Sequence, residues 1–505
     1  MMTQAEDSPK RVERDPLGPI DVPAGAYYGA QAARAIANFP ISGVAIGHFP
    51  IFIRALGQVK KATAIANARL GDLSKAKAEA ICAACDDVIA GRLDHAFPID
   101  VFQGGAGTST NMNANEVIAN RALELLGFAR GRYDVIHPNN DVNLSQSTND
   151  VYPTAIRLAV LFSYGALKGA VARLADEFQQ RGDEFADVIK LGRTQLQDAV
   201  PMTLGQEFKA FASTLREDVA RLDDLSVHFL DVNLGGTAIG TGINAAPEYQ
   251  AVAVEELAKL TGLELVPATD LIEACWDTGA FVLFSGMLKR TAVKLSKIAN
   301  DLRLLSSGPR GGLAEINLPP LQPGSSIMPG KVNPVAPEVV NQVAFQVIGA
   351  DLAVTLAAEA GQLQLNVMEP VIAYNLLNSI TLLTNATNVL REKCVAGLTA
   401  NREPPAPRGE HGGRDGAHAL HRLRAGCGTG EGGAHLRQID PGRARGGSRS
   451  GSRDDRTHER SGDPHEASQG EAFGAAGGGD SLGALGERRP VAPAARSSEN
   501  LRHPP

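Results

Sequence analysis

An apolar stripe of helical period runs through the middle of the chain. Its members recur at spacings of four and three residues: Ile156, Val160, Tyr164, Leu167, Val171, Leu174 and Phe178. This spacing places their side chains on one face of a helix of several turns. Such a helix cannot bury its stripe alone, so the chain must supply partner helices, as in a bundle or a coiled-coil seam.

Further amphipathic stretches can supply those partners. They lie at about 205–230, 279–307, 337–360 and 367–396 and are separated by loops. The chain has 505 residues, of which 43% are hydrophobic and only 5% aromatic, so it can bury a large core of aliphatic and Ala side chains. We therefore expect a mainly α fold in which a long antiparallel bundle carries functional loops at its ends.

One loop combines several chemically useful side chains. Residues 324–333, Gly-Ser-Ser-Ile-Met-Pro-Gly-Lys-Val-Asn, offer the hydroxyls of Ser325 and Ser326, the cation of Lys331 and the carboxamide of Asn333. Prolines on both sides exclude regular helix, so the segment is predicted to be a long mobile connection. Backbone N–H groups of a Gly-rich turn could stabilise a serine alkoxide here. Taken alone, the loop would also fit an Ω-loop with a surface lysine.

Three more clusters share this content of Gly, hydroxyl and amide side chains. They are residues 104–113, 145–150 and 192–198, and each lies next to a predicted helix. Short hydroxyl and amide side chains at helix starts are typical of N-caps and also of anion sites. For one cluster, capping is the simpler interpretation. Four such clusters in one chain favour a shared pocket for a polar ligand that bears carboxylates.

These segments, in this order, resemble the aspartase/fumarase superfamily. GSSIMPGKVNP is similar to the superfamily's signature, and the resemblance extends from about Asp15 to about Glu403. GGAGTSTNMNANEVIANRA, HPNNDVNLSQSTND and GRTQLQDAVPMTLGQEF resemble the motifs of the aspartate ammonia-lyase branch. A fumarase-like chain would usually have Ser at Ala106 and His at Gln195. The missing imidazole fits an enzyme that handles an ammonium group rather than water.

The resemblance implies reversible deamination of L-aspartate to fumarate and ammonia, by anti elimination through an aci-carboxylate intermediate. Ser325 matches the family's catalytic base. Asn149 is the candidate for contacting the departing ammonium, and Gln195 is a substrate-binding candidate of less defined role. The other predicted substrate-binding residues are Thr108, Ser147, Thr148 and Ser326 around the β-carboxylate, and Thr194, Lys331 and Asn333 around the α-carboxylate.

The resemblance also implies a homotetramer in which each active site takes motifs from three subunits. No metal-ligand cluster or dinucleotide fingerprint appears in the sequence, so we expect no cofactor, and activation by a divalent metal stays open. The net charge of −7 gives no basic footprint for nucleic acid. No membrane partner is expected either, since no apolar run reaches membrane-spanning length and the charged N-terminus lacks a secretion signal. We expect a cytoplasmic protein.

We predict three parts for the chain. Residues 1–150 form a mostly helical N-terminal domain, and residues 151–403 form the central bundle with the signature loop 324–333. Residues 404–505 are rich in Gly, Arg and Pro and are expected to be disordered, in place of the family's small C-terminal domain. A reading-frame error explains the sharp change best, because residues 410–427 can be back-translated so that the displaced frame reads STVAVTALTPYIGYERAA. A natural low-complexity tail is the alternative.

Two other functions stay open at this point. A fumarase-like hydratase would interconvert fumarate and malate. A catalytically impaired product would follow if the altered C-terminus removed a domain that the bundle needs.

Overall fold

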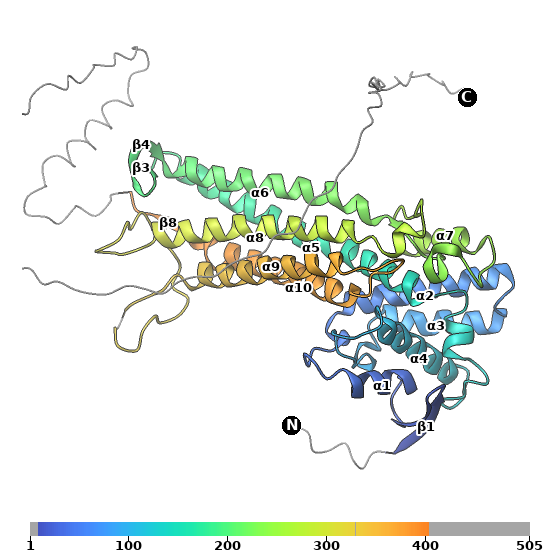
Figure 1. Cartoon of the computed structure of the whole chain (residues 1–505). Coiled ribbons are helices and arrows are strands. Elements are labelled where there is room, and N and C mark those ends of the chain that lie inside the picture. Colours follow the sequence, from blue (N-terminus) through green and yellow to red (C-terminus); the bar gives the residue numbers. More distant parts are fainter. Residues whose placement is uncertain (1–8, 329, 403–505) are drawn as a thin grey trace, which may run out of the picture. The chain divides into compact units, whose positions relative to one another are not determined.

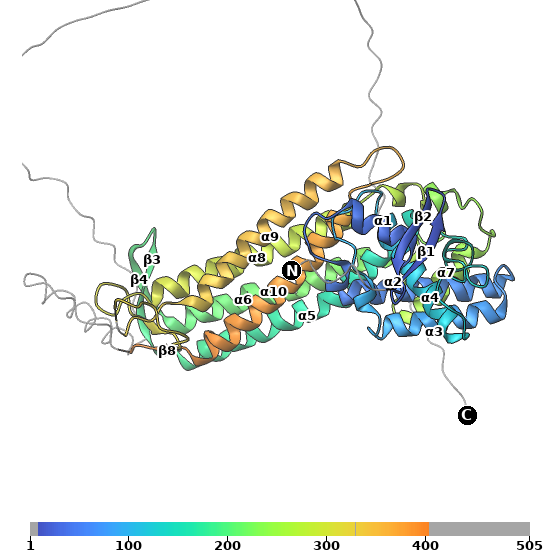
Figure 2. The same cartoon turned by 90° about the horizontal axis from the view of Figure 1, so that it is seen from below.

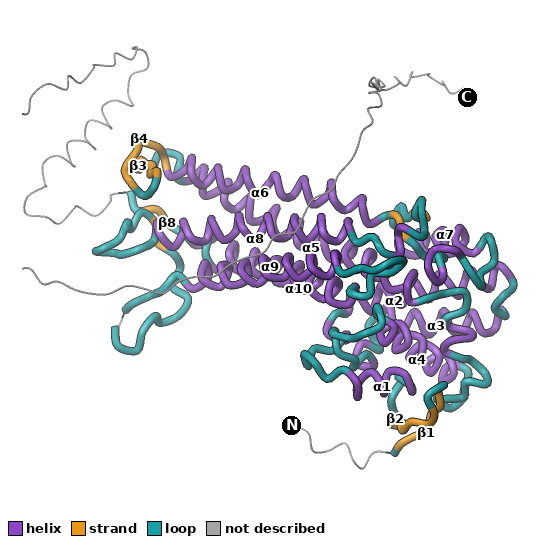
Figure 3. Tube along the Cα trace, viewed as in Figure 1, coloured by secondary structure: helices purple, strands orange, loops and turns teal. Residues whose placement is uncertain are grey.

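A computed structural model describes residues 9–328 and 330–402. The first helices are α1 (Ala30–Asn38), α2 (Pro50–Leu70), α3 (Lys75–Ile89) and α4 (Thr108–Leu125). The remaining helices are α5 (Thr148–Glu184), α6 (Leu204–Ser226), α7 (Tyr249–Thr261), α8 (Gly279–Leu305), α9 (Val335–Glu359) and α10 (Glu369–Lys393). The predicted mainly α fold is confirmed, since helices account for most of the described chain (Figure 3).

The strands are short and form two-stranded pairs. β1 (Lys10–Asp15) pairs with β2 (Gly18–Pro23), and β3 (Ile189–Thr194) pairs with β4 (Gln197–Thr203), both antiparallel. β5 (Asp231–Val232) lies parallel to β6 (Val266–Pro267), and β7 (Ile316–Asn317) lies antiparallel to β8 (Thr399–Ala400). Two π-helical turns, η3 (Pro138–Val142) and η5 (Thr237–Thr241), lie in loops. The short 3-10 turns are Ile46–His48, Asp94–Ala96, Val227–Phe229, Glu273–Cys275 and Val395–Gly397.

The long helices α5, α6, α8, α9 and α10 run side by side as a bundle (Figures 1 and 2). α5 carries the apolar stripe seen in the sequence, and every member is buried except Tyr164, which is half-buried. Phe178 of α5 meets Phe208 and Phe211 of α6 edge-on, at centroid distances of 5.8 and 5.4 Å. Aromatic contacts of this kind add to the area buried between two helices.

The start of α5 packs against a second group of helices, which consists of α2, α3, α4 and α7. α2 packs against α3, α5 and α7, and α4 packs against α3. A capping box fixes the first turn of α5: the Ser147 backbone N–H donates to Asp150 Oδ1 at 2.9 Å, and Ser147 Oγ accepts from the Asn149 backbone N–H at 3.2 Å. The predicted boundary after residue 150 falls in this first turn, and the three-part division stays a prediction. The predicted tail, residues 404–505, lies outside the described residues.

Two described helices, α5 and α9, are long and apolar enough to cross a membrane, judged by length and composition alone. The expectation that no apolar stretch reaches that length is therefore wrong for these two. A core helix of a bundle passes the same test, and α5 is such a helix, because half of its most apolar window is buried. In α9 only 39% of that window is buried, so much of its apolar surface is free in the single chain.

Candidate active site

The first group of predicted site residues lies where α4 and α5 begin. Thr108 is the first residue of α4, and Gly107 before it has a φ of 86°, which glycine adopts without strain. Asn111, one turn further along α4, donates its Nδ2 to Thr148 Oγ1 at 3.1 Å. This hydrogen bond joins the first turn of α4 to the first turn of α5. The structure therefore brings two of the four predicted clusters together, with Thr108, Ser147, Thr148 and Asn149 in one region.

The carboxamide of Asn149 is held in a defined orientation. Pro153 has no N–H to donate to the Asn149 carbonyl four residues earlier, and Asn233 Nδ2 donates to that carbonyl instead, at 2.9 Å. Asn149 Nδ2 donates to the Ala238 carbonyl at 2.7 Å. Its Oδ1 contacts no donor among the described residues. This oxygen is thus available as an acceptor for an ammonium group.

The second group lies in the signature loop between α8 and α9. Ser325 Oγ accepts hydrogen bonds from the backbone N–H groups of Ile327 and Met328, both at 3.1 Å. Donors of this kind favour the alkoxide over the hydroxyl, because they stabilise the negative charge. Gly324 closes the loop, since its N–H donates to the Lys331 carbonyl at 2.7 Å and its own carbonyl accepts from Asn333 Nδ2 at 3.2 Å. Ser326 and Lys331 are exposed.

Thr194 and Gln195 lie at the tip of the β3–β4 hairpin. Gln195 and Leu196 form its two-residue turn and both have positive φ, 54° and 61°. This backbone matches the twist of paired strands but is strained for residues other than glycine. Arg193 Nη1 forms an ion pair with Glu315 Oε1 at 2.6 Å, which ties the hairpin to the segment that follows α8. The hairpin and the signature loop therefore lie at the same end of the bundle (Figure 1).

The two groups lie at opposite ends of the bundle within one chain. Asn233, which holds Asn149, also donates to the Ala274 carbonyl at 3.3 Å, just before α8 begins. α8 has 27 residues and so spans about 40 Å before the segment with the signature loop starts. The other end of that segment leads into α9, which runs back beside α8 (Figure 2). One chain alone therefore does not bring the predicted base to the predicted ammonium contact.

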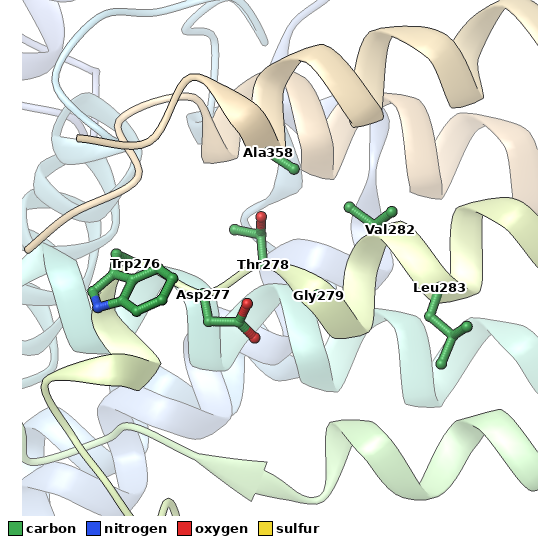
Figure 4. A pocket seen from close by; sticks show the side chains of 7 residues that line it. All are labelled: Trp276, Asp277, Thr278, Gly279, Val282, Leu283 and Ala358. Carbon is green, nitrogen blue, oxygen red and sulfur yellow. The ribbon is translucent and has the colours of Figure 1, made fainter. Parts of the chain in front are cut away.

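Two cavities of about 510 Å³ in the described part of the chain are lined by other residues than the predicted ones. One lies between the start of α8 and the end of α9 and is lined by Trp276, Asp277, Thr278, Gly279, Val282, Leu283 and Ala358 (Figure 4). The other adjoins the β1–β2 hairpin and is lined by Pro9, Pro23, Ala24, Gly25, Ala26, Tyr27, Tyr28, His95 and Ala96. Neither contains a predicted site residue.

Sequence reasoning missed two residues that shape the site. Asn111 bonds to Thr148, and Asn233, which is 1% exposed, bonds to the backbone of Asn149. Asn111 lies inside the predicted 104–113 cluster, so the sequence pattern could have indicated its contact with Thr148. Asn233 stands before a glycine pair, Gly235 and Gly236, and nothing in its local sequence indicates a contact 84 positions away.

Comparison with known proteins identifies the family to which the chain belongs. A family model described as lyase matches residues 18–349, about two thirds of the chain. The chain belongs to this lyase family, within the aspartase/fumarase superfamily. The lyase is 65% identical over 392 residues to aspartate ammonia-lyase of Pseudomonas canavaninivorans, which covers 77% of this chain and 83% of that one. It is 58% identical to aspartate ammonia-lyase of Escherichia coli strain K12, with 78% and 82% covered.

Solved structures give the same fold for this lyase. A fumarate lyase:delta crystallin from Brucella melitensis bound to cobalt is 63% identical, with a TM-score of 0.77, and the match covers 78% of this chain and 85% of that one. A class II fumarase from Schistosoma mansoni is 38% identical, with a TM-score of 0.75 and coverages of 78% and 86%. The resemblance expected from the motifs is confirmed.

Proposed function

We propose that this lyase is an enzyme that converts L-aspartate reversibly to fumarate and ammonia. The observation that carries the proposal is the pattern of identity, which is 58–65% to aspartate ammonia-lyases and 38% to a class II fumarase of the same fold. Ala106 and Gln195, which differ from the usual fumarase residues, point the same way. A fumarase-like hydratase is thereby the weaker candidate.

The chemistry starts at C3 of aspartate. Ser325 Oγ, as an alkoxide, removes the C3 proton, and the electron pair moves into the adjacent β-carboxylate to form an aci-carboxylate. Thr108, Ser147, Thr148 and Ser326 surround this carboxylate and donate hydrogen bonds that stabilise its extra charge. The intermediate then collapses: the C2–N bond breaks, the C2–C3 double bond forms, and ammonia leaves. The chain's own donors do this work, so the proposal needs no cofactor.

The remaining groups orient the substrate. Thr194, Lys331 and Asn333 hold the α-carboxylate, which sets C3 against the base. Asn149 Oδ1 accepts a hydrogen bond from the amino group, because Nδ2 of the same carboxamide is committed to the Ala238 carbonyl. Gln195 lies beside Thr194 at the hairpin tip, where a neutral amide can contact substrate without acting as a base toward water.

Assembly of the site requires several copies of the chain, because its parts lie at opposite ends of the bundle. α9 offers the surface for this. Four of its exposed apolar residues recur along one face: Phe345, Ile348, Leu352 and Leu356, with Phe345 63% and Leu352 60% exposed. An apolar stripe this long is costly in water and typical of an interface. We assign it to contacts between subunits of a homotetramer in which three subunits contribute to each active site.

The function is tested by following fumarate absorbance with the purified full chain. L-Aspartate should yield fumarate and an equal amount of ammonia, and L-malate should yield little fumarate. Malate as the better substrate would contradict the proposal and favour the hydratase. A tetramer without either activity would support the catalytically impaired alternative.

Assembly is tested separately with Phe345→Glu. The charge should break the interface, so the variant should elute as a smaller species and lose activity, while its helical circular dichroism stays. A tetramer that survives this change would show that α9 does not form the interface.

A further inference from the structure

Lys60 is a fully buried lysine that no part of the proposed reaction uses. It lies on α2 with 0% of its surface exposed. A buried ammonium group needs hydrogen-bond partners, because burial removes its water. Its Nζ donates to Asn143 Oδ1 and to Gln146 Oε1, both at 2.8 Å. Both acceptors lie in the segment that leads directly into Ser147.

The partners of Lys60 also connect to the substrate-binding residues. Asn143 Oδ1 accepts from Asn111 and Asn115 of α4 as well, both at 3.1 Å, so three donors from two helices meet at one oxygen. Asn111 Nδ2 donates a second hydrogen bond, to Thr148 Oγ1. Asn143 Nδ2 donates to the Gln146 carbonyl at 3.2 Å, which fixes the turn before α5. The path from Lys60 to Thr148 thus consists of hydrogen bonds throughout.

The charges around Lys60 are few and buried. Asp150 on α5 is 0% exposed and accepts from the backbone N–H groups of Ser147 and Gly235 at 2.9 Å each. Burial lowers the pKa of Lys60 to about 7, against the opposing effects of Asp150 and of Cys85 on α3. Burial raises the pKa of Asp150 to about 6, and Tyr249 on α7 also lies close to this carboxyl. The charge on Lys60 therefore changes near neutral pH.

We propose that Lys60 is a positioning residue for the deamination, which fixes Thr148 and Asn149 in their substrate-binding geometry through Asn143 and Gln146. The inference rests on the proposed function. Hydrogen bonds from the protonated amine are stronger than those from the neutral amine, so the geometry is held best below about pH 7. Lys60 touches no substrate in this account. Its effect is on binding, because a displacement of about 1 Å in a binding group can cost about a hundredfold.

The test compares Lys60→Met with Lys61→Met. Lys61 is the next residue of α2, and it forms an ion pair with Asp86 of α3 at 2.6 Å instead of bonding to Asn143 or Gln146. Lys60→Met should raise KM for L-aspartate about tenfold or more with a smaller change in kcat, whereas Lys61→Met should change neither by more than about twofold. Amide hydrogen exchange of residues 143–150 should speed up in Lys60→Met alone.

The pH profile separates positioning from a merely structural role. In the unsubstituted chain KM should rise as pH increases through about 7, and in Lys60→Met this rise should be absent. If Lys60→Met matches Lys61→Met in KM, in its pH profile and in amide exchange, the inference is wrong.

The test can still be decided if Lys60→Met does not fold or if the chain does not deaminate L-aspartate. If Lys60→Met yields no folded protein, Gln146→Met removes one of the two acceptors and should move KM and exchange in the same direction. Unchanged values in that variant would overturn the inference. If the unsubstituted chain fails to deaminate L-aspartate, the proposed function fails, and amide exchange still decides whether Lys60 holds residues 143–150.

Discussion

The two ends of the bundle hold their site residues in different ways. At the start of α5, Thr148 is 9% exposed and its surroundings are bonded to α2, α4 and the segment around Gly235. In the signature loop Ile327 is 88% exposed, and the hydrogen bonds of Ser325 and Gly324 stay within the loop itself. The first end is preorganised by its buried neighbours, and the second is free to move relative to the bundle.

This difference matches two tasks in the proposed reaction. Donors that stabilise an aci-carboxylate must be fixed before the charge develops, which suits the buried end. A base that closes over the substrate must be able to move, which suits an exposed loop. We therefore expect substitutions in the loop to affect turnover or capture without unfolding the chain, and substitutions at the buried end to alter stability as well.

Ser325→Ala should have the largest effect, because it removes the proposed base. We expect kcat to fall by about a thousandfold or more, with the assembly state and melting temperature unchanged, since the hydroxyl bonds only within its own loop. Steady-state kinetics with size-exclusion chromatography checks this. A variant that keeps normal turnover would show that another group removes the proton.

Lys331→Ala should have the next largest effect, on substrate capture. The exposed lysine is proposed to bind the α-carboxylate in a site closed by other subunits, and such a contact contributes about 2 kcal/mol or more, or about 30-fold in KM. Lys75→Ala is the matched control, because that side chain is 91% exposed far from the signature loop. If KM for L-aspartate is the same in both variants, Lys331 faces solvent in the working enzyme.

Glu369→Gln should have the smallest effect, on stability rather than on catalysis. Glu369 begins α10, is 3% exposed, and has one carboxyl oxygen without a partner among the described residues. Burial raises its pKa well above the ordinary value near 4.5. Its contribution to stability is therefore fully present below that value and is lost as pH rises toward the folded pKa, by at most about 1.4 kcal/mol per pH unit.

The measurement is the melting temperature between pH 5 and pH 9. It should fall with rising pH in the unsubstituted chain and fall less in Glu369→Gln, which stays neutral. Glu392→Gln, on the same helix with a half-exposed side chain, should keep the original slope. Identical slopes in all three proteins would mean that Glu369 does not remain protonated in the fold.

Helices were predicted well because their signal is local. The stretches expected at about 279–307 and 367–396 correspond to α8 (Gly279–Leu305) and α10 (Glu369–Lys393). Apolar residues that recur at spacings of three and four positions mark the face of a helix that is buried. The paired strands were not predicted. Tight hairpin turns are usually recognised by a dipeptide such as Asn-Gly or Gly-Gly, and the turn at Gln195 and Leu196 contains neither. Its turn conformation is visible only in the positive φ angles of the structure.

The site was predicted in part, and the limit is again physical. Motif content assigned the chemistry to four segments, but it could not show that Asn149 and Ser325 lie at opposite ends of the bundle within one chain. Nor did it find Lys60, although the buried face of α2 carries Lys60, Thr63 and Asn67 in line with Ile53 and Leu56. Polar residues on an apolar face need partners from elsewhere in the fold, and a local pattern does not contain them.

Mixing two inactive variants tests the shared site most directly. Ser325→Ala lacks the base at one end of the bundle, and Asn149→Ala lacks the ammonium contact at the other, so each protein alone should be inactive. When the two are refolded together in equal amounts, a site that takes these residues from different subunits is complete in about a quarter of cases. Recovery of about a quarter of the original activity is the predicted result. Mixed tetramers that contain both variants, verified by native mass spectrometry, and yet remain inactive would contradict the shared site.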